Sequence, residues 1–321
     1  MIRVASVGDC MLELQARGSG WALGHAGDTF NTLWMMRALL PSEAETDFVT
    51  AFGDDPFSDR QRDFMAAHGI GTAASPRLPG LRPGLYAITL DAAGERSFTY
   101  WRADSAARRL AEDPGALRHS FTRRDLIHVS GITLAILTPA ARRILRDELA
   151  RARAAGAKVS FDPNWRPALW PAPAEARAAM TELLKITDIA LPSWPDEGAL
   201  FGDPDAKACC ARLMALGVRE VALKLGAEGA WIAAPGTCGQ TVPACPGLTP
   251  LDTTGAGDGF NGAYLTARLS GEAPVPAALI ANRLAGMVIG VYGALADPEA
   301  LRRCRAEARL TPGPATARQS D

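Results

Sequence analysis

Short apolar runs alternate with stretches of helical pattern along most of the chain. The apolar runs occupy residues 2–7, 47–52, 126–130, 157–162, 188–192 and 218–225. Between them lie alanine- and arginine-rich helical stretches, such as residues 139–156 and 173–186. Repeated alternation of strands and helices is typical of a parallel sheet with helices on both faces. The pattern therefore predicts an α/β fold built around a mainly parallel sheet.

One segment, residues 84–102, has a different pattern. The runs "GLYAITL" and "RSFTYWR" flank the turn-like stretch "DAAGE", and no helical stretch separates them. Two strand-like runs joined in this way predict a β-hairpin. Such a hairpin would lie outside the parallel sheet, as a cover over one edge of it.

The composition allows a sizeable core and indicates neither a nucleic acid nor a membrane as partner. Of the 321 residues, 48% are hydrophobic and 21% are charged, and the formal net charge of −1 offers no basic field for nucleic acid. The six cysteines include no CxxC pair, which favours free thiols in a reducing cytosol. The longest apolar run, residues 284–296, contains three glycines and is too short for a membrane span. Because Asp9 and Glu13 also come too early for a signal peptide, we expect a cytoplasmic protein.

Residue types that suit ligand binding gather where the predicted strands end. Open α/β sheets bind their ligands beyond the carboxyl ends of the strands. The stretches at these places are "GHAGDTFN" (24–31), "DPNWRPALW" (162–170), "SWPDE" (193–197), "GAEGA" (226–230) and "DTTGAGDGFNGAYL" (252–265).

The last stretch combines a glycine-rich turn with a helix that begins near residue 257 or 258. The chain has no Gly-Lys dipeptide for a Walker loop, and Phe260 stands where a dinucleotide fingerprint needs its last glycine. What remains is a helix start whose N–H groups and dipole favour negative charge. Asp258 could simply complement that dipole. Alternatively, it could take a proton from a hydroxyl that attacks a bound phosphate.

"DTTGAGDGFNGAYL" resembles the C-terminal signature of the ribokinase-like (PfkB-type) carbohydrate kinases, in which a Gly-Ala-Gly-Asp run ends the ATP site. The resemblance extends over roughly residues 1–300. The stretches "GDCMLEL", "AGDTFN", "GERSFTYWRADSAAR", "HVSGITLAI" and "DPNWRPALW" together are similar to the subgroup that acts on 2-dehydro-3-deoxygluconate. The resemblance implies a three-layer α/β/α sandwich over residues 1–308. It also implies a small β lid from about residues 9–22 and 84–103, and we expect a frayed tail at 309–321.

The same resemblance implies a role for each matching residue. Asp258 would be the catalytic base, and the N–H groups of Gly255, Ala256 and Gly257 would form an anion hole for the phosphoryl group in transit. Tyr86 and Tyr100 would close over the sugar, while Arg102 and Arg166 would meet its carboxylate or a phosphate. The implied substrate-binding residues are Gly27, Asp28, Thr29, Asn31, Tyr86, Tyr100, Arg102, Ile132, Arg166 and Asp258.

ATP and Mg2+ are the implied cofactors, with the metal held mainly by phosphate oxygens and waters. Two positions depart from the family pattern. Ala26 stands where the family usually has the first glycine of a pair, and the metal-associated Asn-x-x-Glu motif appears as Ser193-Trp-Pro-Asp196, or shifted by one residue to Glu197. No direct metal ligand is therefore predicted. The implied nucleotide-binding residues are Asn164, Ser193, Lys224, Gly226, Gly229, Gly255, Ala256, Gly257 and Asn282.

Several of these residues also have a purely structural interpretation. The hairpin residues 100–102 could pack across strands, and Arg166 could stack on Trp165 at the surface. The glycines of "GAEGA" could form only a tight turn. His25 and His128 are predicted to be structural rather than catalytic.

The favoured function is transfer of the γ-phosphoryl group of ATP to the 6-hydroxyl of 2-dehydro-3-deoxy-D-gluconate. Related kinases that act on the galactonate epimer, fructose or ribose remain alternatives. Arg102 and Arg166 argue for an acidic substrate, because a neutral sugar would leave a buried guanidinium unpaired. A non-catalytic sugar-binding regulator is an alternative from another class, and a nicotinamide dehydrogenase is disfavoured by the missing fingerprint. The resemblance also suggests a homo-oligomer that pairs through the lid.

Overall fold

An eight-stranded sheet forms the centre of the computed structural model, which describes residues 1–18, 20–72, 74–90, 96–235 and 239–310. The strand order is β12-β11-β10-β9-β8-β7-β1-β4. All neighbours from β10 to β4 pair in parallel, and β11 and β12 add an antiparallel edge. The strands are β1 (Arg3–Val7), β4 (Glu45–Val49), β7 (Leu126–Ser130), β8 (Lys158–Asp162), β9 (Ile189–Ala190), β10 (Glu220–Lys224), β11 (Ala230–Ala233) and β12 (Gln240–Val242).

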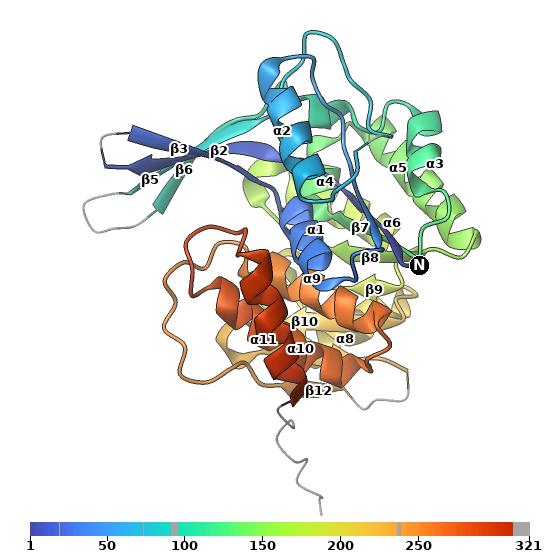
Figure 1. Cartoon of the computed structure of the whole chain (residues 1–321). Helices are drawn as coiled ribbons and strands as arrows, with labels where there is room; N and C mark the ends of the chain where they lie inside the picture. The colour runs from blue at the N-terminus through green and yellow to red at the C-terminus, as the bar shows by residue number, and fades with distance from the viewer. Residues whose placement is uncertain (19, 73, 91–95, 236–238, 311–321) are drawn as a thin grey trace, which may run out of the picture.

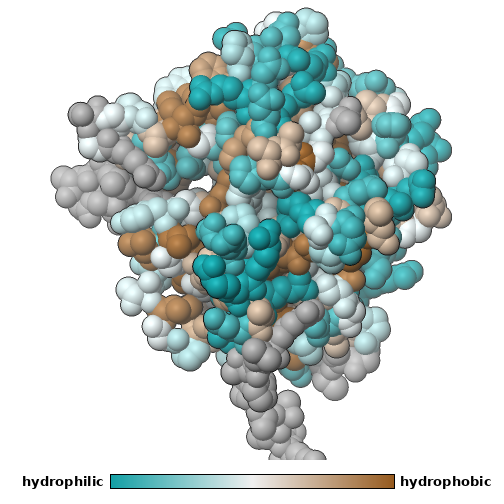
Figure 2. Space-filling model, viewed as in Figure 1, coloured by the Kyte–Doolittle hydropathy of each residue, from teal (hydrophilic) through white to brown (hydrophobic). Residues whose placement is uncertain are grey.

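Helices cover both faces of this sheet and make three layers (Figure 1). One face carries α3 (Pro114–Phe121), α4 (Gly131–Ile136), α5 (Pro139–Ala154), α6 (Pro173–Leu184), α7 (Trp194–Phe201) and α8 (Ala206–Ala215). The other face carries α1 (Asp28–Leu39), α2 (Pro56–Ala67), α9 (Ala256–Leu269), α10 (Pro274–Val288) and α11 (Pro298–Leu310). Hydrophilic residues gather over α11 on the face that Figure 2 shows.

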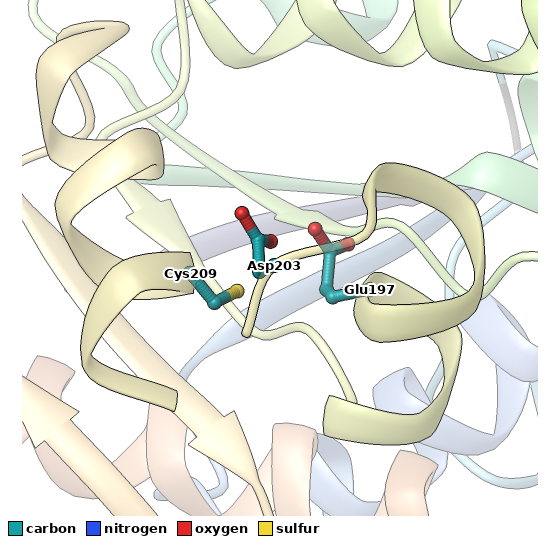
Figure 3. Close-up of side chains that lie close together, drawn as sticks. All are labelled: Glu197, Asp203 and Cys209. Carbon is teal, nitrogen blue, oxygen red and sulfur yellow. The ribbon is translucent and has the colours of Figure 1, made fainter. Parts of the chain in front are cut away.

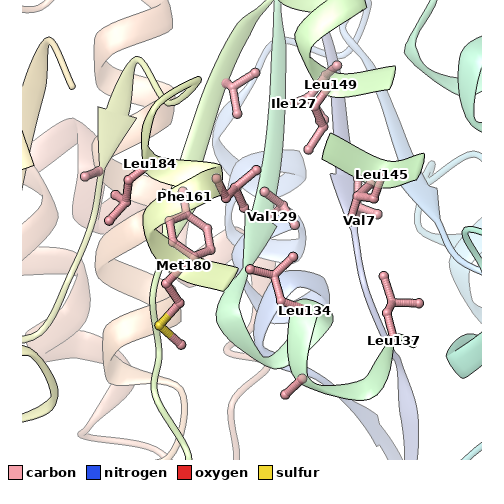
Figure 4. Close-up of a cluster of buried hydrophobic side chains, with 14 of the residues drawn as sticks. Val7, Ile127, Val129, Leu134, Leu137, Leu145, Leu149, Phe161, Met180 and Leu184 are labelled. Atoms are coloured by element: carbon pink, nitrogen blue, oxygen red, sulfur yellow. The ribbon is translucent and has the colours of Figure 1, made fainter. Parts of the chain in front are cut away.

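The core divides into two clusters because successive side chains of a strand point to opposite faces. On the face of α4, α5 and α6, Val7, Ile127, Val129 and Phe161 pack against helix residues such as Met180 (Figure 4). The opposite face buries the apolar residues of α1, α9 and α10. Apolar side chains therefore cover both faces of the parallel strands, and the polar positions that a ligand could reach lie at the strand ends.

A second sheet of four strands projects from the body, at the left of Figure 1. Its order is β3-β2-β5-β6, with antiparallel pairs at both edges and a parallel pair between β2 and β5. Tyr86 lies directly opposite Tyr100 in this sheet. We call this sheet the lid; its strands are β2 (Met11–Arg17), β3 (Gly20–Ala26), β5 (Leu85–Leu90) and β6 (Arg96–Trp101).

The predicted fold class is confirmed, and the predicted strands appear within a few residues of their expected places. The largest shift is at residues 47–52, where the strand runs over Glu45–Val49. The turn predicted at residues 91–95 and the tail from residue 311 onward lie outside the described residues, while α11 continues to Leu310. In the described part of the chain, no helix has the length and apolar character needed to cross a bilayer.

Candidate active site

The glycine-rich stretch after β12 ends in the first turn of α9. Gly255 has φ of 75°, the left-handed region that glycine adopts without strain, and a β-carbon there would lie 2.6 Å from the Ala294 Cβ. The Asp252 carboxylate accepts hydrogen bonds from the N–H groups of Thr254 (2.9 Å) and Gly293 (2.7 Å). These contacts fix the loop so that the start of α9 is presented beyond the strand ends.

Asp258 lies in this first turn and is partly covered. Its Oδ2 accepts a hydrogen bond from the Asn31 Nδ2 at 2.8 Å. Burial, reinforced by the neighbouring Asp28 carboxylate, raises the pKa of Asp258 to about 7. A carboxylate with such a pKa is suited to accept a proton near neutral pH.

The start of α1 lies beside Asp258. A β-carbon on Gly27 would lie 2.0 Å from the Asp9 carbonyl oxygen, so this close backbone approach requires glycine. The Asp28 carboxylate accepts from the Thr29 N–H and from the Asn164 Nδ2, both at 2.8 Å. Burial raises the pKa of Asp28 despite these hydrogen bonds. The predicted sugar-binding segment and the predicted base are therefore adjacent.

A third carboxylate, Asp162 at the end of β8, completes this group. Its Oδ2 accepts from the Lys224 Nζ at 2.7 Å and from the Asn261 Nδ2 at 2.6 Å. The Lys224 Nζ also donates to the Asn261 Oδ1 at 2.9 Å. We call the group of Asp28, Asp162 and Asp258 with Asn31, Asn164, Lys224 and Asn261 the acidic centre.

An ion pair lies where the lid joins the body, and two aromatic rings lie on the lid itself. The Arg102 Nη2 donates to the Asp9 Oδ2 at 3.0 Å, and the two side chains are only 10% and 3% exposed. The buried Arg102 Nε has no hydrogen-bond partner among the described residues. The Tyr86 hydroxyl donates to Glu13, and the ring of the exposed Tyr100 lies 5.7 Å from that of Tyr86.

The remaining predicted site residues are more widely spread. Ser193 pairs with Lys224 in an isolated β-bridge, whereas the Asn282 Nδ2 donates to the Val242 carbonyl at 2.9 Å. Arg166 is half-exposed and forms a 3.4 Å ion pair with Asp196. Ile132 is half-buried on α4, and Gly226 and Gly229 both adopt positive φ in the turn between β10 and β11.

A possible cation site lies away from the acidic centre, between α7 and α8. Ligand atoms of Glu197, Asp203 and Cys209 lie within 4.8 Å of one another, and Figure 3 shows their side chains close together. The Arg212 Nη2, however, already donates to Glu197 at 2.5 Å and to Asp203 at 2.7 Å. Since the guanidinium takes the place of a cation, we interpret this group, called the Arg212 cluster, as a structural ion pair.

The two histidines considered in the sequence have structural surroundings. The His128 Nδ1 contacts the Ser160 Oγ at 3.0 Å, and burial lowers the pKa of His128 to about 4. His25 packs against Phe64 with ring centroids 4.7 Å apart, and burial lowers its pKa. Both imidazoles are therefore neutral at pH 7.

Four polar residues of the site were not predicted individually: Asp9, Glu13, Asp162 and Asn261. Asp9 and Asp162 stand just after β1 and at the end of β8, so their position at strand ends was a usable signal. Asn261 follows Asp258 by three residues on α9, which places both on one helix face. Nothing local marks Glu13, which meets Tyr86 only through strand pairing.

Comparison with protein families gives one match that covers most of the chain. The model of the pfkB family carbohydrate kinases matches residues 1–301. The chain is 39% identical over 303 residues to the 2-dehydro-3-deoxygluconokinase of Dickeya dadantii, covering 93% of this chain and 98% of that protein. It is 37% identical over 304 residues to the enzyme of the same name from Escherichia coli K12, with the same coverage.

Solved structures give the same fold. A fructokinase from Vibrio cholerae O395, with fructose, ADP and a calcium ion bound, superposes with a TM-score of 0.80 at 25% identity over 94% of this chain and 98% of that one. A 2-dehydro-3-deoxygluconokinase from Thermotoga maritima superposes with a TM-score of 0.80 at 21% identity, covering 95% of this chain and 100% of that one. At that identity, the second likeness bears on the fold alone.

Proposed function

The chain belongs to the pfkB family of carbohydrate kinases, and we propose that it uses ATP to phosphorylate the 6-hydroxyl of 2-dehydro-3-deoxy-D-gluconate. The observation that carries the proposal is the position of Asp258. Its carboxylate lies in the first turn of α9, beside the sugar-binding segment at Gly27, and burial raises its pKa to about 7. A base and an anion-binding helix start are thus combined at one point.

In the proposed step, the 6-hydroxyl oxygen forms a bond to the γ-phosphorus of ATP. The bond from that phosphorus to the β–γ bridging oxygen breaks, and its electron pair leaves with ADP. The hydroxyl proton moves to Asp258. The N–H groups of Gly255, Ala256 and Gly257 stabilise the charge on the phosphoryl oxygens during transfer.

The acidic group of the sugar is assigned to Arg102. Its guanidinium is buried and donates to Asp9 through Nη2, while its Nε has no partner among the described residues. An unpaired buried donor is costly, and a substrate carboxylate would satisfy it. Tyr86 and Tyr100 on the lid are assigned to close over the sugar, and Ile132 would wall the sugar pocket. Arg166, which is more exposed, is assigned to the sugar carboxylate or to a phosphate.

ATP and Mg2+ are the cofactors of this reaction. The residues assigned to the nucleotide are Asn164, Ser193, Lys224, Gly226, Gly229 and Asn282, together with the anion hole. Mg2+ would enter with the nucleotide and be held mainly by phosphate oxygens and waters, because Asp196 is paired with Arg166 and Glu197 with Arg212. We place the reaction in the cytoplasm, where ATP is available.

We assign the lid two tasks, closing over the sugar and pairing with a second copy of the chain. Closure excludes water and so limits wasteful hydrolysis of ATP. The lid exposes apolar side chains, and a partner lid would cover those on one of its two faces. Those with at least 40% exposure are Trp21, Leu23, Phe98, Tyr100 and Trp101.

The test is an ADP-release assay with a panel of sugar acids and neutral sugars. We expect the highest kcat/KM with 2-dehydro-3-deoxygluconate and much lower values with fructose and ribose. In Arg102→Met, the KM for the sugar acid rises by about tenfold or more, while the KM for a neutral sugar changes little. Equal effects on both substrates would contradict the carboxylate assignment, and preference for a neutral sugar would contradict the proposed substrate.

A further inference from the structure

We propose that Lys224 is a further catalytic residue, whose ammonium donates a hydrogen bond to the phosphoryl group in transfer, and that Asn261 is the residue that positions it there. The inference deepens the proposed kinase function and rests on it. The proposed function places Lys224 only along the nucleotide. Here the Lys224 ammonium is assigned a direct contact with the phosphoryl group that is transferred.

One N–H donor of the Lys224 ammonium has no acceptor among the described residues. An ammonium carries three N–H donors, and the described residues supply acceptors for two of them, in Asp162 at 2.7 Å and Asn261 at 2.9 Å. A β-carbon built on Gly257 would lie 3.8 Å from the Lys224 Nζ. The charge is thus beside the N–H groups assigned to the anion hole, and the third donor is available to a phosphoryl oxygen.

Asn261 determines where this ammonium lies. The residue is 1% exposed, and its two polar atoms bridge the ion pair, since Nδ2 donates to Asp162 while Oδ1 accepts from Lys224. It follows Asp258 by three residues on α9. Helix α9 therefore carries the base, Asp258, and also holds the Lys224 ammonium through Asn261. Because Asp258 and Asn261 are about one helical turn apart, the helix sets the separation of the base and the ammonium.

The charge balance of the acidic centre explains why a cation is needed there. Asp28, Asp162 and Asp258 place three carboxyl groups around the position assigned to the γ-phosphoryl group. A phosphoryl group with charge on three oxygens would be repelled by ionised neighbours. Lys224 is the cation that the acidic centre itself contributes, and its side chain is only 12% exposed, so water screens it weakly.

The test compares the binding of ADP with that of an ATP analogue whose β–γ bridge is an imido group, both measured calorimetrically with Mg2+. In Lys224→Met and Asn261→Ala, we expect the affinity for the analogue to fall by about tenfold, while the affinity for ADP stays within about twofold. The kcat of Lys224→Met should fall by about a hundredfold or more, and Lys224→Arg should recover part of the loss.

Tyr264→Phe is the matched control. It removes the hydrogen bond from the Tyr264 hydroxyl to Glu220, which also joins α9 to β10, without touching Lys224. We expect its ratio of analogue to ADP affinity to equal that of the wild type. If Tyr264→Phe and Asn261→Ala lower the ratio equally, Asn261 only holds the helix in place and its positioning role is overturned.

An unchanged affinity ratio in Lys224→Met, or an equal loss of ADP and analogue binding, would overturn the role of Lys224. If Lys224→Met does not fold, Asn261→Ala decides alone, because it keeps the pair of Lys224 with Asp162. Neither binding measurement needs the sugar. A wild-type enzyme that phosphorylates no sugar acid would therefore overturn the proposed substrate while the affinity ratio still decides on Lys224.

Discussion

The acidic centre and the Arg212 cluster contain the same kinds of groups but differ in how their charges are paired. Each has a carboxyl group whose pKa burial raises to about 7, Asp258 in one and Glu197 in the other. In the Arg212 cluster, one guanidinium contacts both Glu197 and Asp203. In the acidic centre, the cation contacts Asp162, and Asp258 receives only a neutral amide.

The difference shows why a shifted pKa does not by itself identify a catalytic group. Glu197 is 1% exposed and enclosed between two helices, so no substrate atom can reach its carboxylate. Asp258 is partly open and lies at a helix start beyond the strand ends. Access and the surrounding donors, rather than the pKa, distinguish the two carboxyl groups.

Replacing Asp258 with Asn should give the largest effect and should be confined to catalysis. We expect kcat to fall by about a hundred- to ten-thousand-fold, because the base that takes the hydroxyl proton is lost. The affinity for ADP should remain close to that of the wild type. Steady-state kinetics and calorimetry measure the two quantities, and near-normal kcat would remove Asp258 as the base.

Replacing Arg212 with Met should lower the stability of the protein and leave catalysis nearly unchanged, which is the reverse of the result expected for Asp258→Asn. Removal of the guanidinium leaves Glu197 and Asp203 buried without their cation, which should lower the free energy of unfolding by about 3 kcal/mol. The kcat/KM of the folded variant should stay within about threefold of the wild type. Urea unfolding and kinetics test this, with Arg219→Met as the control because the Arg219 side chain is 75% exposed.

A large loss of kcat/KM in folded Arg212→Met, without loss of stability, would contradict the structural interpretation of the Arg212 cluster.

The pH dependence of stability and that of activity should distinguish Glu197 from Asp258. Because the pKa of Glu197 is raised from 4.5 to about 7 in the folded state, the stability it contributes is complete below pH 4.5 and is lost as the pH rises through about 7. Activity should change in the opposite direction, rising through about pH 7 as Asp258 loses its proton. In Glu197→Gln, the free energy of unfolding should fall less as the pH rises, by about 1–3 kcal/mol compared with the wild type. The midpoint of the pH profile of kcat/KM should stay where it is in the wild type.

Unfolding experiments and kcat/KM profiles between pH 5 and about pH 8 measure both effects. A shifted activity midpoint in Glu197→Gln would mean that the two clusters are coupled.

The smallest effect is expected at the pair of Arg166 and Asp196, which is more exposed than either cluster. Arg166→Met should change the free energy of unfolding by less than about 1 kcal/mol, because an exposed ion pair contributes little. Because Arg166 is assigned to the sugar carboxylate or to a phosphate, the KM for the sugar acid or the KM for ATP should rise a few-fold. Unchanged KM values for both ATP and the sugar acid would leave Arg166 with a surface role only.

The sequence predicted the body of the fold well because its strands are short apolar runs between regular helices. The strand at Leu126–Ser130 was predicted at its observed bounds. The antiparallel strands β11 and β12 and the pairing of β2 with β3 were not predicted as such. Gly20–Ala26 combines glycine, alanine and histidine with two apolar residues, so its strand depends on its partners rather than on its own pattern.

Candidate site residues could be named from the sequence where a stretch shows its own chemistry. Asp258 stood out because glycines surround it, and Gly27 to Asn31 because they open a helix after a strand. Asp162 and Asn261 did not stand out, since their contact joins positions 99 residues apart. Likewise, the pairing of Arg102 with Asp9 depends on how the lid joins the body, which no local pattern encodes.

The most direct test of the account is a crystal structure of the protein with 2-dehydro-3-deoxygluconate and a non-hydrolysable ATP analogue. We predict that one oxygen of the Asp258 carboxylate lies about 3 Å from the 6-hydroxyl of the sugar acid, with that hydroxyl in line with the γ-phosphorus. A 6-hydroxyl bound beyond hydrogen-bonding reach of Asp258, with another group in contact with it, would contradict the account.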